Sequence, residues 1–454
     1  MISAFANIWK VPELKKRVLF TLGIILLIRI GSAIPIPGID SGLIQEVTSR
    51  AGHKANDLMQ MVMLLSGGAM SQAAIFSLGI MPYITASIIM QMMMAVVPAL
   101  KRMIQEGGES GRQQFIQYTR YLTLVICLGQ SFLLARTIAF APEQIFGGSA
   151  NNWTNLMVLD SNWSFIGIAV ATITCGTMFI MWLGEQITER GIGNGASVII
   201  AVGIIDRIPS VSIQAFQLFF GGADEPKNPM FLIPLVALLL LAIGFVVMLT
   251  QGVRKIPVQY AKRMVGQKMY GGGATFMPLK VNYSGVMPII FGQALLLFPF
   301  QILKMVPWTA MQKFANIMQP GSAIYEVSFA MLILFFAYFW VSTQFDPVQI
   351  SDDLKKHGGY IPGIRPGQAT SDFLDFTMTR ITFAGAMALV ILAVVPELLG
   401  TTMGVPRPVA SFFGGTSLLI MVGVMLDVMR QIESHLLMRH YDGFLKKGKI
   451  RGRR

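Results

Sequence analysis

Polar side chains that could do chemistry are concentrated in one apolar segment, residues 79–97. It contains Thr85, Ser87 and Gln91, together with a proline and a tyrosine, among isoleucine and methionine residues. Hydrocarbon offers such groups no hydrogen-bond partner, so in a membrane helix they must face other protein or a water-filled path. The segment therefore predicts a membrane-spanning helix with a polar face that lines a passage or meets another helix.

The apolar stretch before this helix is interrupted. Residues 59–77 contain Ser66-Gly-Gly68, which makes the stretch too broken to span a membrane easily on its own. We expect a short re-entrant helix at about residues 59–74 instead. A broken helix followed by a helix with a polar stripe is typical of a passage through a membrane.

Catalytic and metal-binding patterns are missing from the sequence. The four histidines lie in predicted loops or in the tail, and neither an HExxH sequence nor a Walker A loop occurs. Gly191-Ile-Gly-Asn-Gly195 matches a phosphate-binding loop only weakly because no strand precedes it, so a tight turn is the better interpretation. The methionine-rich runs 59–63 and 90–94 lack thiol or imidazole partners and indicate apolar packing. We predict no enzyme, no metal and no cofactor.

The composition indicates an all-α polytopic membrane protein. Of 454 residues, 54% are apolar and only 13% are charged, against about 25% charged residues in soluble proteins. Many apolar runs approach the roughly 20 residues that cross a bilayer. Cys127 and Cys175 both lie in such runs, so no disulfide framework is expected. We predict ten transmembrane helices, at residues 18–34, 76–97, 119–139, 164–183, 195–208, 230–250, 286–306, 326–343, 380–397 and 409–427.

The lysines and arginines set the predicted orientation. Most of them fall in alternate loops, in the amphipathic N-terminus at residues 1–17 and in the basic tail at residues 428–454. The positive-inside rule then places both termini in the cytoplasm. The first span is expected to be retained, because no convincing signal-peptide cleavage site follows it.

Two of the predicted cytoplasmic loops, at residues 251–285 and 344–372, are much longer than usual helix connections. Their charge has two interpretations: an orientation signal with anionic-lipid contact, or a docking surface for RNA or an acidic soluble partner. Turn sequences in 360–367 favour docking, because they would hold one arginine at a stiff loop tip. The docking cations are Arg254, Lys255, Lys262, Arg263, Lys268 and Arg365.

A small-solute or ion-coupled transporter is the alternative function. Such proteins usually keep ionisable side chains at mid-membrane depth, whereas here Arg29 is the clear exception in nearly uncharged spans. The groups along the expected path are isoleucine, Thr85, Ser87, Gln91 and Gln293. An apolar constriction can stop ions by dewetting, so these residues favour a passive conduit over a pump.

Several ordered motifs resemble the SecY family, the central subunits of the bacterial protein translocase. The resemblance runs essentially from Trp9 to the tail. Its motifs are Ala33-Ile-Pro-Ile-Pro-Gly38, Ser66-Gly-Gly-Ala69, Ile75-Phe-Ser-Leu-Gly-Ile-Met-Pro-Tyr-Ile84, Glu109-Ser-Gly-Arg112, Gln117-Tyr-Thr-Arg120, Ile187-Thr-Glu-Arg-Gly-Ile-Gly-Asn-Gly195, Val258-Gln-Tyr-Ala-Lys-Arg263, Pro362-Gly-Ile-Arg-Pro-Gly367 and Gly414-Gly-Thr-Ser-Leu-Leu-Ile420.

The resemblance implies a fold of two pseudo-symmetric five-helix halves, residues 18–208 and 230–427, joined by a hinge loop at 209–229. It implies a plug that includes Met61, Met63, Leu65, Ser66, Gly67, Gly68 and Met70. A lateral gate between spans 2 and 7 would contain Thr85, Ser87, Gln91, Gln293 and Phe298. The pore ring would be Ile80, Ile84, Ala196, Ile200, Ile290 and Ile420. Ala196 is small where isoleucine is common in the family; this loosens the seal, or a neighbour such as Val198 fills the position.

The resemblance also implies the activity and the partners. We expect a channel that passes unfolded secretory polypeptides across the bacterial plasma membrane and releases hydrophobic segments sideways into the bilayer. The implied partners are the membrane subunits SecE and SecG, the SecA motor ATPase, the ribosome, signal sequences and unfolded preproteins, with anionic lipids around the channel. The chain itself supplies no energy source.

Overall fold

The computed structural model describes most of the chain. The described residues are 11–40, 42–44, 68–146, 153, 156, 161–220, 230, 232–260, 263–265, 268–270, 274–305, 322–403, 409–410 and 415–447. They form two compact units. Unit 1 comprises Met1–Leu218 with Val424–Arg454, and unit 2 comprises Phe219–Gly423.

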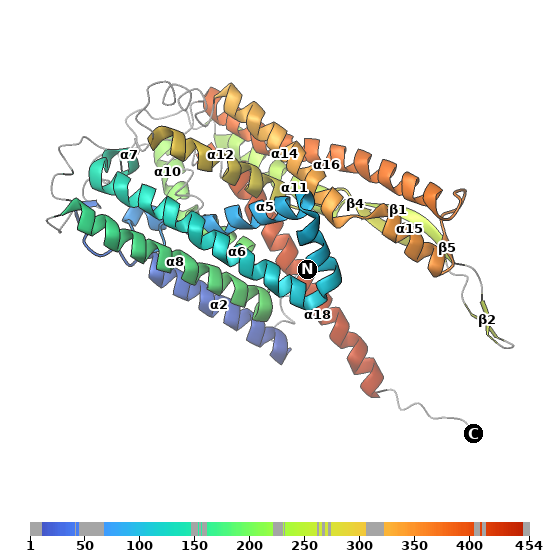
Figure 1. The fold of residues 1–454 in the computed structure, drawn as a ribbon. Helices are drawn as coiled ribbons and strands as arrows, with labels where there is room; N and C mark the ends of the chain where they lie inside the picture. Colours follow the sequence, from blue (N-terminus) through green and yellow to red (C-terminus); the bar gives the residue numbers. More distant parts are fainter. Residues whose placement is uncertain are drawn as a thin grey trace. The chain divides into compact units, whose positions relative to one another are not determined.

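Unit 1 is helical in its described residues, and its helices α2, α6 and α8 lie side by side (Figure 1). Its elements are α2 (Pro12–Ser32), the 3₁₀ turn η1 (Ala69–Gln72), α5 (Met81–Val96), α6 (Pro98–Phe140), α7 (Glu143–Phe146), α8 (Asn162–Arg190), α9 (Gly195–Asp206) and most of α10 (Ile208–Phe220). The last helix of the chain, α18 (Thr416–Lys447), begins in unit 2 and ends in unit 1.

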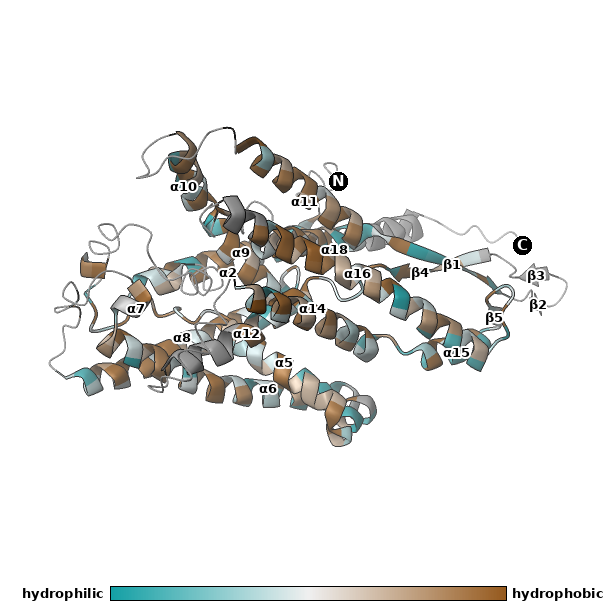
Figure 2. Ribbon diagram, turned by 90° about the horizontal axis from the view of Figure 1, so that it is seen from above, coloured by the Kyte–Doolittle hydropathy of each residue, from teal (hydrophilic) through white to brown (hydrophobic). Residues whose placement is uncertain are grey.

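Unit 2 combines long helices with strands. Its helices are α11 (Leu232–Gln251), α12 (Met287–Met305), α14 (Ala323–Gln344), α15 (Pro347–Lys356) and α16 (Gln368–Met403). Its strands are β1 (Val253–Tyr260), β2 (Arg263–Val265), β3 (Lys268–Tyr270), β4 (Ala274–Lys280) and β5 (Gly359–Tyr360). Hydrophobic residues cover α11 and α14, whereas β1 and α15 carry many hydrophilic ones (Figure 2).

Each of the ten predicted spans overlaps a helix, although several bounds differ by many residues, and the predicted all-α polytopic membrane protein is confirmed. In the described part of the chain, six helices are long and apolar enough to cross a membrane. A seventh is obtained if α5 and the start of α6 count as one span, bent by 102° at Val97. The helices α2, α12 and α18 are not among them, and the described apolar part of α12, Met287–Leu296, is shorter.

The predicted loop at 251–285 contains a β-structure that the sequence analysis did not predict. Strand β1 pairs antiparallel with β4, from Val253 opposite Lys280 to Gln259 opposite Ala274, and β5 pairs at the other edge of β1. Ile256 and Val258 of β1 are buried while their neighbours are exposed. This alternation is the strand signal, because one face packs on an apolar core that includes Phe345, Leu374 and Met378.

Two other predicted loops are helical. Residues 209–220 of the predicted hinge lie in α10, and residues 428–447 of the predicted tail continue α18. In α10 the buried residues Val211, Ala215 and Phe219 recur every four positions. In α18 Ile432 packs in a cluster with Leu14 of α2. Apolar residues at helical spacing gain burial on one face, so these segments continue as helices.

Helices α8 and α9 approach each other at a pair of glycines. A Cβ atom added to Gly195, at the start of α9, would overlap the main-chain carbonyl of Gly184 in α8. Small residues allow membrane helices this close approach, and the contact orders α9 against α8. Thr188 supports the same contact, because its Oγ1 accepts a hydrogen bond from the Gly195 N–H at 2.9 Å.

We expect Gly195→Ala to lower the free energy of unfolding by about 1–3 kcal/mol, because the added methyl group forces α8 and α9 apart. Thermal unfolding of the purified protein in detergent measures the change. Gly167→Ala in α8 is the matched control, since no atom of the described residues lies within 4 Å of its added Cβ. Equal stability of the two variants would contradict the close contact.

Candidate functional site

The Ala33–Gly38 motif holds the chain that leads into α5. Pro35 forms an antiparallel bridge with Ala74, and the Ile36 N–H donates to the Ala73 carbonyl at 2.8 Å. The Ile75 N–H donates to the Ile34 carbonyl at 2.9 Å. The motif thus acts as a short strand partner, which satisfies backbone groups that hydrocarbon could not.

The predicted plug is described only at its end. Gly68 has φ 85°, a left-handed conformation that favours glycine, and Met70 is buried in the 3₁₀ turn η1. Met70 packs in a cluster with Ile36 and Phe165. The other predicted plug residues, Met61, Met63, Leu65, Ser66 and Gly67, lie outside the described residues.

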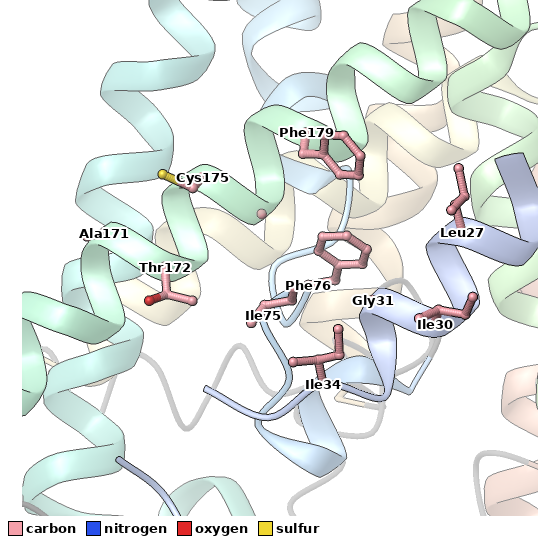
Figure 3. A pocket seen from close by; sticks show the side chains of 11 residues that line it. Leu27, Ile30, Gly31, Ile34, Ile75, Phe76, Ala171, Thr172, Cys175 and Phe179 are labelled. Carbon is pink, nitrogen blue, oxygen red and sulfur yellow. The ribbon is translucent and has the colours of Figure 1, made fainter. Parts of the chain in front are cut away.

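An apolar cavity of about 590 Å³ lies beside this segment, between α2 and α8 (Figure 3). Leu27 and Ile34 of the first predicted span line it, together with Phe76 from the segment between η1 and α5 and Phe179 from α8. The Phe76 ring occupies the space that a side chain at Gly31 of α2 would need. None of the described pore, gate or docking residues is among its lining residues.

Four predicted ring residues lie in unit 1. Ile80, Ile84 and Ile200 are buried, and Ala196 is half-buried. Ile80 and the start of α9 both lie close to Gly184 of α8. A Cβ atom added to Gly184 would lie 3.4 Å from Ile80 Cδ1 and 3.9 Å from the Ala196 nitrogen. Unit 1 therefore brings these two ring positions to one place.

Two neighbours of Ala196 point in different directions. Ile199 Cδ1 would lie 3.3 Å from the same Cβ placed on Gly184, next to Ile80. Val198 Cγ2 instead would lie 2.9 Å from a Cβ placed on Gly193, on the side of the glycine turn. Ile199 thus packs where Ile80 packs, while Val198 packs against the turn.

The glycine turn that opens α9 is held by contacts with two other helices and by its own cap. The Gly193 N–H donates to Gln431 Oε1 of α18 at 2.7 Å, and the Ile192 N–H donates to Thr21 Oγ1 of α2 at 3.2 Å. Asn194 caps α9, since its Oδ1 accepts from the Ser197 N–H at 3.3 Å. These bonds fix the start of the helix that carries Ala196 and Ile200.

Ile290 of α12 and Ile420 of α18, the two remaining ring residues, belong to unit 2, and both are buried there. The isoleucines of the predicted ring carry no hydrogen-bonding atom on the side chain. A ring of these residues would offer a translocating chain only dispersion contacts. The closed set of six stays a prediction.

The predicted gate residues lie on α5 and α12. In α5, Thr85 is buried and its Oγ1 donates to the Met81 carbonyl at 3.1 Å, while Gln91 Nε2 donates to Ser87 Oγ at 3.2 Å. In α12, Gln293 is buried, and Phe298 lies further along the helix. Among the described residues, the side-chain oxygens of both glutamines lack a hydrogen-bond partner. Each helix therefore has an amide oxygen available for a polar contact.

The exceptional Arg29 has a partner that the sequence analysis did not predict. Its Nη1 lies 2.8 Å from Asp206 Oδ2 at the end of α9, and its Nη2 donates to the Val202 carbonyl at 2.7 Å. Pairing lowers the cost of a charge at membrane depth. A second pair joins Arg120 of α6 to Glu185 of α8 through two bonds of 3.0 and 2.6 Å.

The predicted docking cations occupy several elements of unit 2. Arg254 and Lys255 are exposed on β1, and Arg365 is exposed between β5 and α16. Arg263 and Lys268 belong to the β2–β3 hairpin, whereas Lys262 lies outside the described residues. Within the described ranges, no group of three or more His, Cys, Asp and Glu could hold a metal ion.

Known proteins are similar to this chain over nearly its whole length. The profile of the SecY family matches residues 74–429. Proteins named protein translocase subunit SecY are 38% identical in Chlamydia trachomatis and 40% identical in Thermotoga maritima, with each chain covered completely. The protein of that name from Escherichia coli is 40% identical over 97% of this chain and 96% of its own.

Solved structures with a similar fold are translocation channels. A protein-conducting channel has a TM-score of 0.60 at 17% identity, with 93% of each chain covered. Sec61 in a canine ribosome–channel complex has a TM-score of 0.56 at 16% identity, again with 93% of each chain covered. The fold, the family profile and the full-length relatives agree, and the chain belongs to the SecY family.

Proposed function

We propose that the protein is the channel subunit of a protein translocase, which passes unfolded polypeptides across the membrane and releases hydrophobic segments sideways into it. The observation that carries the proposal is the identity of about 40% to full-length relatives named protein translocase subunit SecY. The path would run through the ring of Ile80, Ile84, Ala196, Ile200, Ile290 and Ile420.

The ring would close the resting channel because narrow apolar constrictions dewet and exclude ions. Isoleucine has neither donor nor acceptor groups on its side chain, so the ring would hold no sequence strongly. The burial of Ile80 and Ile84, and the place of Ile80 beside Gly184, support a seal on the side of unit 1. Ile199, packed beside Ile80, offers bulk next to the small Ala196.

A signal segment would open the channel sideways, between α5 and α12. Gate contacts between polar side chains in a membrane are worth roughly 1 kcal/mol each, so an apolar helix that partitions into lipid can compete with them. The amide oxygens of Gln91 and Gln293, which have no hydrogen-bond partner in the part of the chain that the structure describes, support a polar gate. The plug would then leave the path.

The chain would draw its energy from a partner and catalyse no reaction itself. We infer that the SecA motor or a ribosome docks on Arg254, Lys255 and Arg365, with SecE and SecG beside the channel in the bacterial plasma membrane. The similarity in fold to a channel solved with a ribosome supports this, as does the exposure of the three cations. Both termini would face the cytoplasm, where anionic lipids attract the basic tail.

The transporter alternative is less well supported. Ion-coupled carriers rely on ionisable groups that change partner at membrane depth, whereas Arg29 is engaged by both Asp206 and the Val202 carbonyl. Reconstitution separates the two functions. A carrier takes up its solute through the purified chain alone, but the proposed channel exports a preprotein only when a motor is added.

Arg365→Glu should reduce motor-driven export at least several-fold while the protein still assembles in the membrane, because the reversal repels an acidic partner. Export of a preprotein into proteoliposomes measures the effect. Lys356→Glu, the same change at an exposed position of α15, is the control. Export by Arg365→Glu at the wild-type rate would refute docking at this residue.

Ile290→Asn should raise the ion leak of the resting channel several-fold and admit preproteins with weak signal segments, because an amide in the constriction favours its wetting. Planar-bilayer conductance and export of a preprotein with a defective signal measure the two effects. Ile290→Val keeps an apolar surface and should behave like the wild type. Unchanged leak and selectivity in Ile290→Asn would count against the ring.

Cysteines introduced at Thr85 and Phe298, in a chain that carries Cys127→Ala and Cys175→Ala, should form a crosslink that stops export. The reason is that a signal segment could no longer part the two helices. Oxidation followed by an export assay tests this, and reduction with dithiothreitol should restore export. Translocation through the crosslinked protein would be incompatible with a lateral gate at these positions.

A further inference from the structure

Two buried hydroxyl groups hold the main chain around Arg365. The Thr370 hydroxyl, at the start of α16, donates to the Arg365 carbonyl at 2.9 Å. The Ser351 hydroxyl, in α15, donates to the Gly367 carbonyl at 2.7 Å. Both side chains are only 2% exposed. The turn Arg365-Pro-Gly367 is thus pinned from two helices.

The rest of the loop is fixed by other means. Its left-handed positions are glycines, Gly363 with φ 84° and Gly367 with φ 104°. The Ile364 N–H donates to the carbonyl of Ile361, which is buried in the unit 2 core. At the loop start, the Tyr360 hydroxyl donates to Gln259 Oε1 of β1 at 3.0 Å.

The Arg365 side chain is exposed although its main chain is held. Pro366 restricts the backbone of Arg365, the residue before it, to extended conformations. The hydrogen bond from Thr370 then fixes the orientation of the Arg365 carbonyl. Packing alone would accept valine at 370, since valine has the shape of threonine. The hydroxyl is what the turn requires, because without it the Arg365 carbonyl loses the hydrogen bond from Thr370.

A preordered loop binds a partner more tightly than a mobile one, because no conformational entropy is lost on docking. We propose that Thr370 and Ser351 are positioning residues for partner docking: their hydroxyls hold the Arg365 turn in the conformation that a soluble motor recognises. This inference rests on the proposed function, since it assumes that Arg365 is a docking residue. Neither hydroxyl is expected to touch the partner.

The first test separates the loop from the overall fold. Hydrogen exchange should become at least about fivefold faster at the amides of residues 359–367 in Thr370→Val, with no change in the helices. Thr370→Ser keeps the hydroxyl and should retain wild-type exchange. Thr379→Val is the matched control, because Thr379 is an exposed threonine of the same helix whose hydroxyl donates to the Asp375 carbonyl one turn earlier. Unchanged exchange in Thr370→Val would overturn the proposal.

The second test asks whether Thr370 acts through Arg365. Binding of purified SecA to proteoliposomes that contain each variant gives the affinities. Thr370→Val alone should weaken binding about three- to tenfold, with Thr370→Ser and Thr379→Val near wild type. In the Arg365→Glu background, Thr370→Val should have almost no further effect, because the positioned group is already lost.

The outcomes distinguish the two proposals. An equal loss from Thr370→Val in both backgrounds would overturn positioning, since the effect would not pass through Arg365. Normal SecA binding by Arg365→Glu would instead refute docking at that residue, whatever the exchange data show. Faster loop exchange with unaltered binding by Thr370→Val would also overturn the inference, because docking would then not need a fixed turn.

Discussion

Hydrocarbon gives polar groups no hydrogen-bond partner, and this constraint governs the described part of the chain. Backbone groups outside helices find partners inside the protein, as where Ile36 and Ile75 pair across the Ala33–Gly38 motif. Arg29, the charged residue of the first predicted span, also has a partner inside the protein, because it forms an ion pair with Asp206. Within the described ranges, the buried amide oxygens of Gln91 and Gln293 depart from this rule, as do the hydroxyls of Thr177 and Thr382 and the Nε of Arg207.

Close backbone approach is the second element of the design. Gly195 against Gly184, and Gly31 beneath the Phe76 ring, bring helices and the plug end to distances that larger residues would prevent. The glycine turn before α9 is then tied to α2 and α18 by hydrogen bonds. This framework places Ile80 and the start of α9, which carry two positions of the proposed ring.

Much of this arrangement could be predicted from the sequence. Long apolar runs located the helices, and motif resemblance gave the family, because both signals are local and repeated. The sequence analysis does not predict strand β1, although Ile256 and Val258 alternate with exposed residues, because the charged segment between two spans is assigned as a loop. Helix α10 was missed for a similar reason: Val211, Ala215 and Phe219 recur every four residues in a segment assigned as a hinge.

Contacts between distant residues could not be read from one sequence. Nothing local connects Arg29 with Asp206, or Ser351 with the carbonyl of Gly367, because tertiary packing selects these partners. Ala196 illustrates the same limit on local patterns: the bulk beside Ile80 comes from Ile199, whereas Val198 turns towards Gly193. The direction of a side chain depends on how its helix is rotated, which the neighbouring elements set.

The central claim is that a translocating polypeptide passes through the isoleucine ring. A photo-crosslinking amino acid at Ile84 or at Ile290, combined with a preprotein arrested in transit, tests it most directly. The account predicts that both positions crosslink to the same short stretch of the arrested chain, and that the outward-facing Leu241 of α11, which is 68% exposed, does not. Crosslinks from Leu241 alone, with none from Ile84 or Ile290, would contradict it.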